Sequence, residues 1–227
     1  LREKGPSVSN ATTPNTPAAA PAMPAKAPTP ISMADRLLEL KKRRDVLMLG
    51  GGADRIAKHH AAGNLTARER IDVLVDNAPF HERDGFAKHR CTTFGMDGKD
   101  FPADGVVTGS GTIDKRLVHL ASQDFTVGGG ALGEVHGDKI VEMMKMSQKT
   151  GTPFIFINDS GGARIQEGID SLGAYGRVFY HNTLLSGLVQ NRDSVAALLT
   201  QGFHQSGVDG VAQDQQGRHA VANVVLR

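Results

Sequence analysis

The 227-residue chain is long enough for one full domain with additional segments, and its composition, 39% hydrophobic and 22% charged, is that of a globular protein. Its 26 basic and 24 acidic residues are dispersed and leave a net charge of +2, which argues against a nucleic-acid-binding protein. The single cysteine, Cys91, excludes an internal disulfide or a cysteine-based zinc site, and no apolar run is long enough for a membrane span or a secretory peptide. We therefore expect a cytoplasmic protein without a metal centre.

The two ends of the chain are predicted not to join the folded core. Seven of the ten prolines precede Met33, in a stretch dominated by Ala, Pro, Thr and Asn that buries too little apolar area to offset chain entropy. Residues 1–32 are therefore predicted to be a disordered linker. Residues 191–227 are rich in Gln, Asn, Asp and Gly and show no sustained periodicity, which predicts a divergent, disordered tail.

Residues 33–76 carry helix signals and are predicted to form a helical arm. Ser32 is suited to cap the first helix, and Thr66 begins a capping box ahead of a later one. His59 and His60 point about 100° apart on a helix and cannot bind one metal together, so both are expected on the helix surface. Apolar residues expected on one face of the first helix are Leu37, Leu40 and Leu47.

Strand and helix signals alternate over residues 77–190, which predicts the α/β class. A polar turn separates the first two apolar runs, as in a hairpin. The later strand is short and wholly apolar, as expected of a buried strand. In order, the expected elements are strand, strand, helix, strand and helix, over residues 105–113, 117–122, 132–149, 154–157 and 167–185.

A glycine-rich loop follows each of two expected strands: QDFTVGGG over 123–130 and NDSGGAR over 158–164. Such glycines permit positive φ and close ligand approach, so that N–H groups can converge on one anionic oxygen, as in an oxyanion hole. A simple tight turn remains an alternative for either loop alone. Ser160 is expected to be a loop hydrogen bonder and not a nucleophile, because Asn158 replaces the glycine of the G-x-S-x-G elbow. GGGALG over 128–133 lacks the acidic residue required of a dinucleotide fingerprint.

Five strings in the chain carry a resemblance to a known family. They are GNLTARERI (63–71), KHRC (88–91), VVTGSGTI (106–113), SQDFTV (122–127) and INDSGGARIQEG (157–168). In this order they resemble the carboxyltransferase (β) subunit of biotin-dependent acyl-CoA carboxylases, especially propionyl-CoA carboxylase. The same strings occur in related subunits that decarboxylate methylmalonyl-CoA or glutaconyl-CoA, or that transfer carboxyl groups directly, so these reactions remain alternatives.

The resemblance implies a crotonase/ClpP-like β-β-α spiral and the acyl-CoA-binding N-terminal half of a carboxyltransferase. The implied reaction moves a carboxyl group from carboxybiotin to the α carbon of a short acyl-CoA such as propionyl-CoA. By motif, the N–H groups of Gly161 and Gly162 would bind the enolate oxygen, while Gly129, Gly130 and Ala163 would shape the acyl-CoA side. Biotin is implied to be carried by the biotin carboxylase/biotin carrier (α) subunit, which would join an oligomer of β subunits in an ATP-dependent complex.

Four charged residues and the cysteine receive narrower expectations. Lys88 and Arg90 are candidates for binding the CoA phosphates, with a solvated polar turn as the alternative. Arg164 and Glu167 are expected to brace the second glycine loop. Cys91 is expected to be a small packing residue, because no base that would activate it as a nucleophile can be named.

The resemblance ends near Gly187, and residues 188–227 contain nothing like the biotin-binding half of the family. We therefore expect a truncated carboxyltransferase that is inactive by itself, because the family shares its active site between the N-terminal half of one subunit and the C-terminal half of another. One alternative is a chain that binds acyl-CoA, or docks to a full-length subunit, without turnover. Another is a crotonase-like hydrolase or isomerase, for which no side-chain acid or base can be named near either loop.

Overall fold

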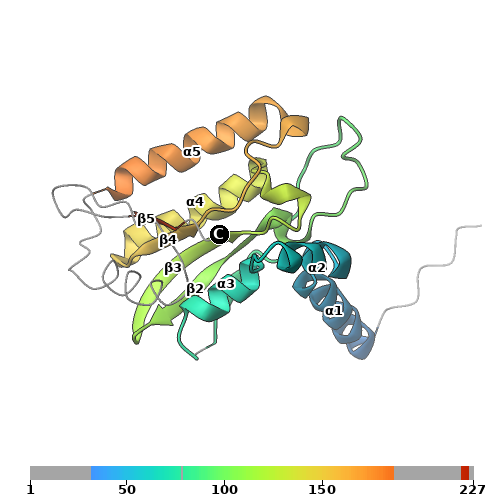
Figure 1. Ribbon diagram of the computed structural model, residues 1–227, viewed down its shortest axis with the longest axis horizontal. Coiled ribbons are helices and arrows are strands. Elements are labelled where there is room, and N and C mark those ends of the chain that lie inside the picture. Colours follow the sequence, from blue (N-terminus) through green and yellow to red (C-terminus); the bar gives the residue numbers. More distant parts are fainter. Residues whose placement is uncertain (1–31, 78, 187–220, 225–227) are drawn as a thin grey trace, which may run out of the picture.

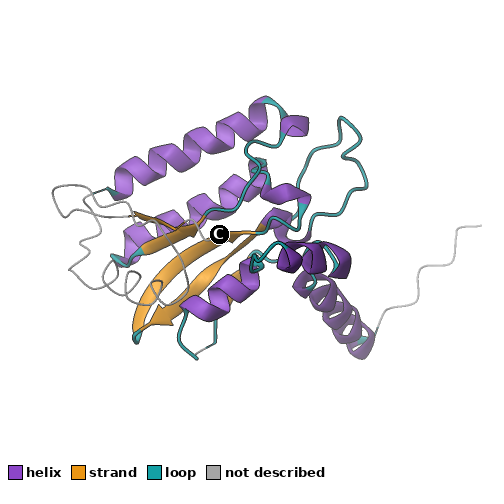
Figure 2. Cartoon of the chain, in the orientation of Figure 1, coloured by secondary structure: helices purple, strands orange, loops and turns teal. Residues whose placement is uncertain are grey.

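The computed structural model describes residues 32–77, 79–186 and 221–224, which form an α/β structure around one sheet (Figures 1 and 2). The strands follow the order β1-β2-β3-β4-β5 across this sheet. β1, β2 and β3 pair antiparallel, whereas β4 and β5 are added parallel to β3. Their bounds are β1 His81–Arg83, β2 Val106–Ile113, β3 Arg116–Gln123, β4 Phe154–Ile157 and β5 Val221–Val224.

Helices cover both faces of the sheet. α4 lies on one face with α5 packed over it, and α3 lies on the other, while α1 and α2 extend to one side (Figure 1). The α-helices are α1 Met33–Met48, α2 Ala53–Ala61, α3 Ala67–Leu74, α4 Glu134–Thr150 and α5 Ile169–Leu185. Three short 3-10 helices are η1 Pro102–Gly105, η2 Gly128–Gly130 and η3 Ile165–Glu167. The predicted hairpin, helix, buried strand and second helix are all present.

Alternation along β4 shows how the sheet is buried on both faces. Phe154 and Phe156 pack with α4 and α5, whereas Ile155 and Ile157 pack on the α3 side. Because side chains alternate across a strand, a wholly apolar run is what a strand buried on both faces requires. Burying each large apolar side chain contributes about 1.5–3 kcal/mol, so these two layers fix the strand that leads to the second glycine loop.

The chain order places both glycine loops at one edge of the sheet. β3 and β4 are parallel neighbours, so the loops that follow Gln123 and Ile157 leave the sheet at the same end. Loops at the carboxyl ends of adjacent parallel strands are the usual place for a ligand site in open α/β sheets. The second glycine loop is followed by η3 and α5, and the first by η2 and α4.

The helical arm has the predicted caps, and most of the apolar side of its first helix is exposed. Ser32 Oγ accepts from the Asp35 N–H at 3.1 Å, and Thr66 forms the complete capping box with its third helical residue. Leu47 is buried, but Leu37 and Leu40 are 59% and 44% exposed. The three leucines share one side of α1, as predicted, and Leu47 in the last turn is the member of the set that the described structure buries.

The predicted linker over 1–32 lies outside the described residues except for Ser32, which caps α1. The predicted tail over 191–227 also lies outside them except for Val221–Val224, the strand β5. The divisions at 33–76 and 77–190 stay predictions. Within the described ranges, none of the helices combines the length and the apolar character needed to cross a bilayer.

Candidate functional site

The two glycine loops are joined by backbone hydrogen bonds. The Gly161 N–H donates to the Gly129 carbonyl at 2.9 Å. Leu132 then forms a parallel bridge with Ala163, in which its N–H donates to the Gly162 carbonyl and its carbonyl accepts from the Arg164 N–H, both at 2.9 Å. These bonds therefore join the two loops into one unit, although more than 30 residues separate them in the sequence.

Glycine is required in the two loops for different reasons. Gly129 and Gly130 have φ of +68° and +61°, and a Cβ on Gly130 would lie 2.2 Å from the Asp159 carbonyl oxygen. Gly162 has φ of +107°, but a Cβ there would meet no atom within 4 Å. Gly161 has no positive φ, and its Cβ would lie 3.6 Å from the Gly129 oxygen. Both loops need glycine conformations, but only the first needs glycine for lack of space.

The N–H groups expected to bind an enolate already have acceptors within the two joined loops. Gly161 donates to Gly129, and the Gly162 N–H donates to Ser160 Oγ at 3.1 Å. Ser160 is thus the loop hydrogen bonder that the sequence predicted. In the bridge to Leu132, the backbone of Ala163 faces away from the pairing, and within the described residues nothing accepts from its N–H. The Ala163 N–H is therefore a backbone donor of this loop that has no acceptor among the described residues.

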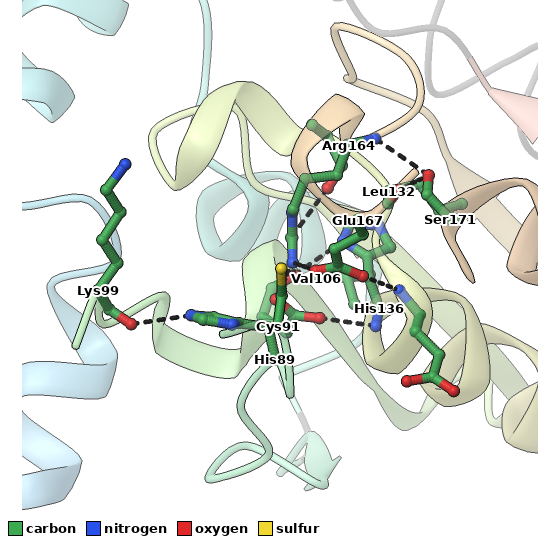
Figure 3. Close-up of polar contacts among 12 residues, drawn as sticks. His89, Cys91, Lys99, Val106, Leu132, His136, Arg164, Glu167 and Ser171 are labelled. Atoms are coloured by element: carbon green, nitrogen blue, oxygen red, sulfur yellow. Dashed lines mark hydrogen bonds and ion pairs between the residues drawn. The ribbon is translucent and has the colours of Figure 1, made fainter. Parts of the chain in front are cut away.

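A buried arginine ties both loops to the body of the protein. Arg164 is 3% exposed; its Nη1 lies 2.6 Å from Asp104 Oδ1 and 2.8 Å from Glu167 Oε1, and its Nη2 donates to the Ala131 carbonyl at 2.9 Å (Figure 3). Glu167 also accepts from the backbone N–H of Glu134, the first residue of α4. Burial raises the pKa of Asp104, against the attraction of Arg164. Arg164 and Glu167 brace the loop, as expected.

A series of hydrogen bonds connects the second loop to β3 and to α4. The Asp159 N–H donates to Gln123 Oε1, the Gln123 amide contacts His136 Nε2 at 3.2 Å, and His136 Nδ1 lies 2.8 Å from the Asp104 carbonyl. These contacts fix His136 as the neutral tautomer with the proton on Nδ1. Burial first, and then the positive charge of Arg164, lower the pKa of His136 to about 3. The groups that form this series of hydrogen bonds, the side chains of Gln123 and His136 and the backbone of Asp159 and Asp104, are therefore uncharged at neutral pH.

Helix α2 and the turn before it contact the first loop. A Cβ on Gly51 would lie within 2 Å of the Thr126 carbonyl oxygen, and the Gly51 N–H donates to Thr126 Oγ1 at 3.0 Å. Arg55 Nη1 donates to the same carbonyl at 3.3 Å. His59 is 9% exposed and stacks on Phe125 at 5.9 Å between ring centres. The prediction that His59 lies on the surface is wrong, because its side of α2 faces this loop, which is distant in sequence.

The remaining predicted residues lie away from the joined loops. Lys88 Nζ lies 2.9 Å from Asp100 Oδ1, and Lys88 lines a cavity shared with α1. Arg90 Nη1 lies 3.5 Å from the carboxylate of Glu134. Cys91 is partly buried, and its Sγ lies 3.4 Å from the Gln166 carbonyl oxygen, beside the Arg164 network (Figure 3).

Two cavities flank the joined loops. The first, of about 690 Å³, is bordered by Gly128, Gly129 and Asp159. Its other walls include three basic residues, Arg55, Lys58 and Lys99, together with Phe101 and Phe125. The second, of about 460 Å³, lies beside Ser160 and Gly162 and has walls of Phe156, Tyr175 and Phe179. The loops thus separate a basic cavity from a largely apolar one.

Sequence reasoning missed several of these residues. Arg55 and Lys58 gave no signal beyond an amphipathic helix, and their meeting with the first loop depends on long-range packing. The sequence pattern gives Asp159 of the second loop no role, yet its carboxylate forms an ion pair with Arg70 of α3. Across the described ranges, no three His, Cys, Asp or Glu residues are grouped so as to hold a metal ion.

Comparison with known proteins identifies close relatives of this architecture. The family model of the carboxyl transferase domain matches residues 58–191. Methylmalonyl-CoA decarboxylase subunit alpha of Propionigenium modestum is 53% identical over 156 residues, which are 69% of this chain and 30% of that protein. Propionyl-CoA carboxylase beta chain of Roseobacter denitrificans is 54% identical over 157 residues, 69% of this chain and 31% of that protein.

A solved structure gives the same result in three dimensions. A crystal structure of transcarboxylase 12S, described as a hexamer assembly with methylmalonyl-coenzyme A and methylmalonic acid bound, superposes with a TM-score of 0.68 at 54% sequence identity. The match covers 70% of this chain and 31% of that one. The chain spans about 30% of the length of the curated relatives that it matches.

Proposed function

The chain belongs to the carboxyl transferase domain family and has its crotonase-like fold, and from this premise we propose that it is the acyl-CoA-binding part of a biotin-dependent carboxyltransferase. The family and the fold that the five sequence strings predicted are thereby confirmed. The proposed reaction places a carboxyl group on the α carbon of a short acyl-CoA such as propionyl-CoA. The observation that carries the proposal is the joined pair of glycine loops between a basic and a largely apolar cavity.

The basic cavity suits the CoA moiety. Arg55, Lys58 and Lys99 line it, and CoA carries several phosphate charges that such groups bind as charge-assisted hydrogen bonds. Lys88 and Arg90 remain candidates for phosphate contacts, although each is engaged with a carboxylate at 2.9 and 3.5 Å. The apolar cavity beside Gly162 suits a short acyl chain. The thioester carbonyl would then lie at the second loop, between the two cavities.

The second loop would stabilise the enolate. When the α carbon loses its proton, the electron pair moves to the thioester oxygen, and N–H donors aimed at that oxygen lower the barrier by about 3 kcal/mol each. The Ala163 N–H is available within the described structure, and the Gly162 N–H becomes available if the Ser160 hydroxyl rotates away. The Gly161 N–H is committed to Gly129, so its proposed role requires the loops to separate locally.

The carboxyl donor is proposed to be carboxybiotin carried by a partner α subunit, and it would supply both the carboxyl group and the atom that accepts the α proton. Transcarboxylase 12S is described as a hexamer. On that basis, we propose that this protein acts within an oligomer of β subunits. The cytoplasmic location expected from the sequence stays a prediction.

Two alternatives remain: a different carboxyl-transfer reaction at the same site, and binding of acyl-CoA without turnover. The relatives include both a carboxylase subunit and a decarboxylase subunit, so decarboxylation or direct transfer uses the same proposed enolate site. A chain that binds acyl-CoA without turnover is the binding-class alternative, and it uses the same cavities. The alternative of a hydrolase or isomerase gains no support, because Tyr175 is the one ionisable side chain among the described walls of the cavity beside Gly162, and burial raises its pKa further above the usual phenol value, so it stays protonated and is no base.

Isothermal titration of the full chain with propionyl-CoA tests the proposal. Lys58→Gln and Lys99→Gln are each expected to weaken binding about tenfold, because each removes one charged donor. Lys41→Gln is the matched control, since Lys41 is exposed on α1 and outside the cavity walls. Binding that is equally weakened by the control, or no binding by the unaltered chain, contradicts the proposal. Addition of a biotinylated carboxylase partner with ATP, bicarbonate and propionyl-CoA then separates turnover from binding alone.

A further inference from the structure

A buried ion pair links the helical arm to the second glycine loop. Arg70 of α3 is 2% exposed, and its Nη1 lies 2.6 Å from Asp159 Oδ2. Asp159 is the residue immediately before Ser160, whose hydroxyl binds the Gly162 N–H. We propose that Arg70 is a positioning residue that, through Asp159, sets the conformation of residues 158–163. The inference rests on the proposed function for the importance of that loop, but the ion pair itself does not depend on it.

The energetics make this pair a specific constraint. Removing a guanidinium from water costs several kcal/mol unless a partner compensates. Asp159 supplies the carboxylate that the structure places against the Arg70 side chain, and the contact is electrostatic, because neither Nη1 nor Nε of Arg70 has a hydrogen-bond partner among the described residues. Moving Asp159 away would leave the charge of Arg70 buried and unpaired. The loop is therefore stable in the position in which the Asp159 carboxylate meets Arg70, and strongly disfavoured in others.

Asp159 is fixed through its side chain and through both of its backbone groups. Its N–H donates to Gln123 Oε1 at 3.1 Å, and its carbonyl oxygen fills the space that a Cβ on Gly130 would need. His59 adds a weaker contact, with Nε2 at 3.6 Å from the same carboxylate oxygen. The backbone contacts come from the sheet and the first loop, whereas the side-chain contacts come from α3 and α2. Only the latter connect the loop to the helical arm.

A neighbouring ion pair supplies the matched comparison. Arg68 lies in the same helix and makes two hydrogen bonds to Glu82, at 2.8 and 3.0 Å, with both side chains largely buried. This pair anchors α3 to β1 and contacts neither glycine loop. Replacing Arg68 therefore removes a largely buried ion pair from the same helix and leaves the contacts of the second loop intact.

The experiment measures amide hydrogen exchange of the full chain, unaltered and with Arg70→Met, Asp159→Asn, both together, or Arg68→Met. Arg70→Met and Asp159→Asn are each expected to speed exchange of the Gly161 and Arg164 amides at least tenfold relative to the Met143 and Met144 amides of α4. Arg68→Met is expected to change that ratio less than twofold. In the double variant, this relative exchange rate is expected to exceed that of either single variant by no more than twofold, because both substitutions break the same contact.

A parallel readout separates this inference from the proposed function. If the unaltered chain binds propionyl-CoA, Arg70→Met is expected to weaken that binding at least tenfold and Arg68→Met less than twofold. If the unaltered chain binds none, the proposed function fails while the exchange ratios still decide the role of Arg70. An unchanged loop-to-α4 ratio in Arg70→Met overturns the inference. Should that variant fail to fold, Asp159→Asn decides instead, because it removes the carboxylate charge without altering α3, and an unchanged ratio in it overturns the inference equally.

Discussion

Gly130 and Gly162 both have positive φ and both lie in the joined loops, yet their surroundings are opposite. A Cβ on Gly130 would collide with the Asp159 carbonyl, whereas a Cβ on Gly162 would stand in open space. The first loop is therefore rich in glycine so that another part of the chain can pack against it. The second is rich in glycine although nothing in the described chain occupies the space. One sequence signal thus marks an internal contact in one loop and an accessible surface in the other.

The largest effect is expected at the internal contact. Gly130→Ala is expected to destabilise the chain by at least about 3 kcal/mol, because the new methyl group must displace backbone and the residue must also keep a left-handed φ. Chemical denaturation followed by circular dichroism measures this change. A loss below 1 kcal/mol would show that the loops separate easily and would erase the contrast with Gly162.

Acid is expected to lower the free energy of unfolding, because it protonates His136, which supports the second loop through Gln123. In the folded state the pKa of His136 is lowered to about 3, so the folded protein binds a proton at this group less readily than the unfolded protein does. Neutral His136 therefore stabilises the fold fully above the unfolded-state pKa near 6.5. This stabilisation is lost as the pH falls from there toward 3. From pH 7 to pH 5 this group alone is expected to cost about 2 kcal/mol of stability. Denaturation at both pH values measures it, and His136→Asn should remove most of that difference. Equal pH dependence in the variant assigns the effect to other groups.

The accessible glycine is expected to show a smaller stability effect and a larger binding effect. Gly162→Val is expected to cost about 1–3 kcal/mol, all from the unfavourable φ of +107°, since no atom lies within 4 Å of the Cβ position. The side chain would fill the space beside the loop, so binding of propionyl-CoA should fall below detection while the fold persists. Titration of the folded variant with unchanged affinity would remove Gly162 from the proposed site.

Gly161→Ala is expected to have the smallest effect. Its φ is not in the left-handed region, and the new Cβ would be in ordinary contact with the Gly129 oxygen at 3.6 Å. We expect a stability change within about 0.5 kcal/mol, as for other unstrained substitutions. Thermal or chemical denaturation measures it next to Gly162→Val. A loss above 2 kcal/mol would mean that the Gly161–Gly129 hydrogen bond tolerates no adjustment.

The sequence predicted most of the α/β order because its signals are local. The apolar run of β4 and the helical spacing of Ile140, Met143 and Met144 each depend on residues within one element, and all of these residues are buried. The two glycine loops were also found, since each follows a strand. Their pairing through Leu132 and Ala163 was not, because no local pattern records a bridge between residues 31 positions apart.

The supporting polar residues were harder to predict for a physical reason. Arg70 and His59 have the spacing of ordinary helix-surface residues, and only the packing of α2 and α3 against the loops makes them buried. Leu37 and Leu40 show the converse: their spacing places them on one side of α1, but the described structure leaves them exposed. Periodicity shows which residues share a face, and it does not show whether another element covers that face.

The bridge between Leu132 and Ala163 sets conditions for any attempt to transplant this site into another scaffold. Each loop takes its register from the other, so adding or deleting one residue in 128–131 would misplace the backbone donors of 161–163 without altering a single side chain there. A protein engineer would have to graft both loops with their spacing intact, together with the arginine at 164 and its two buried carboxylates. The smallest transferable unit of this site is consequently a pair of loops with a shared register.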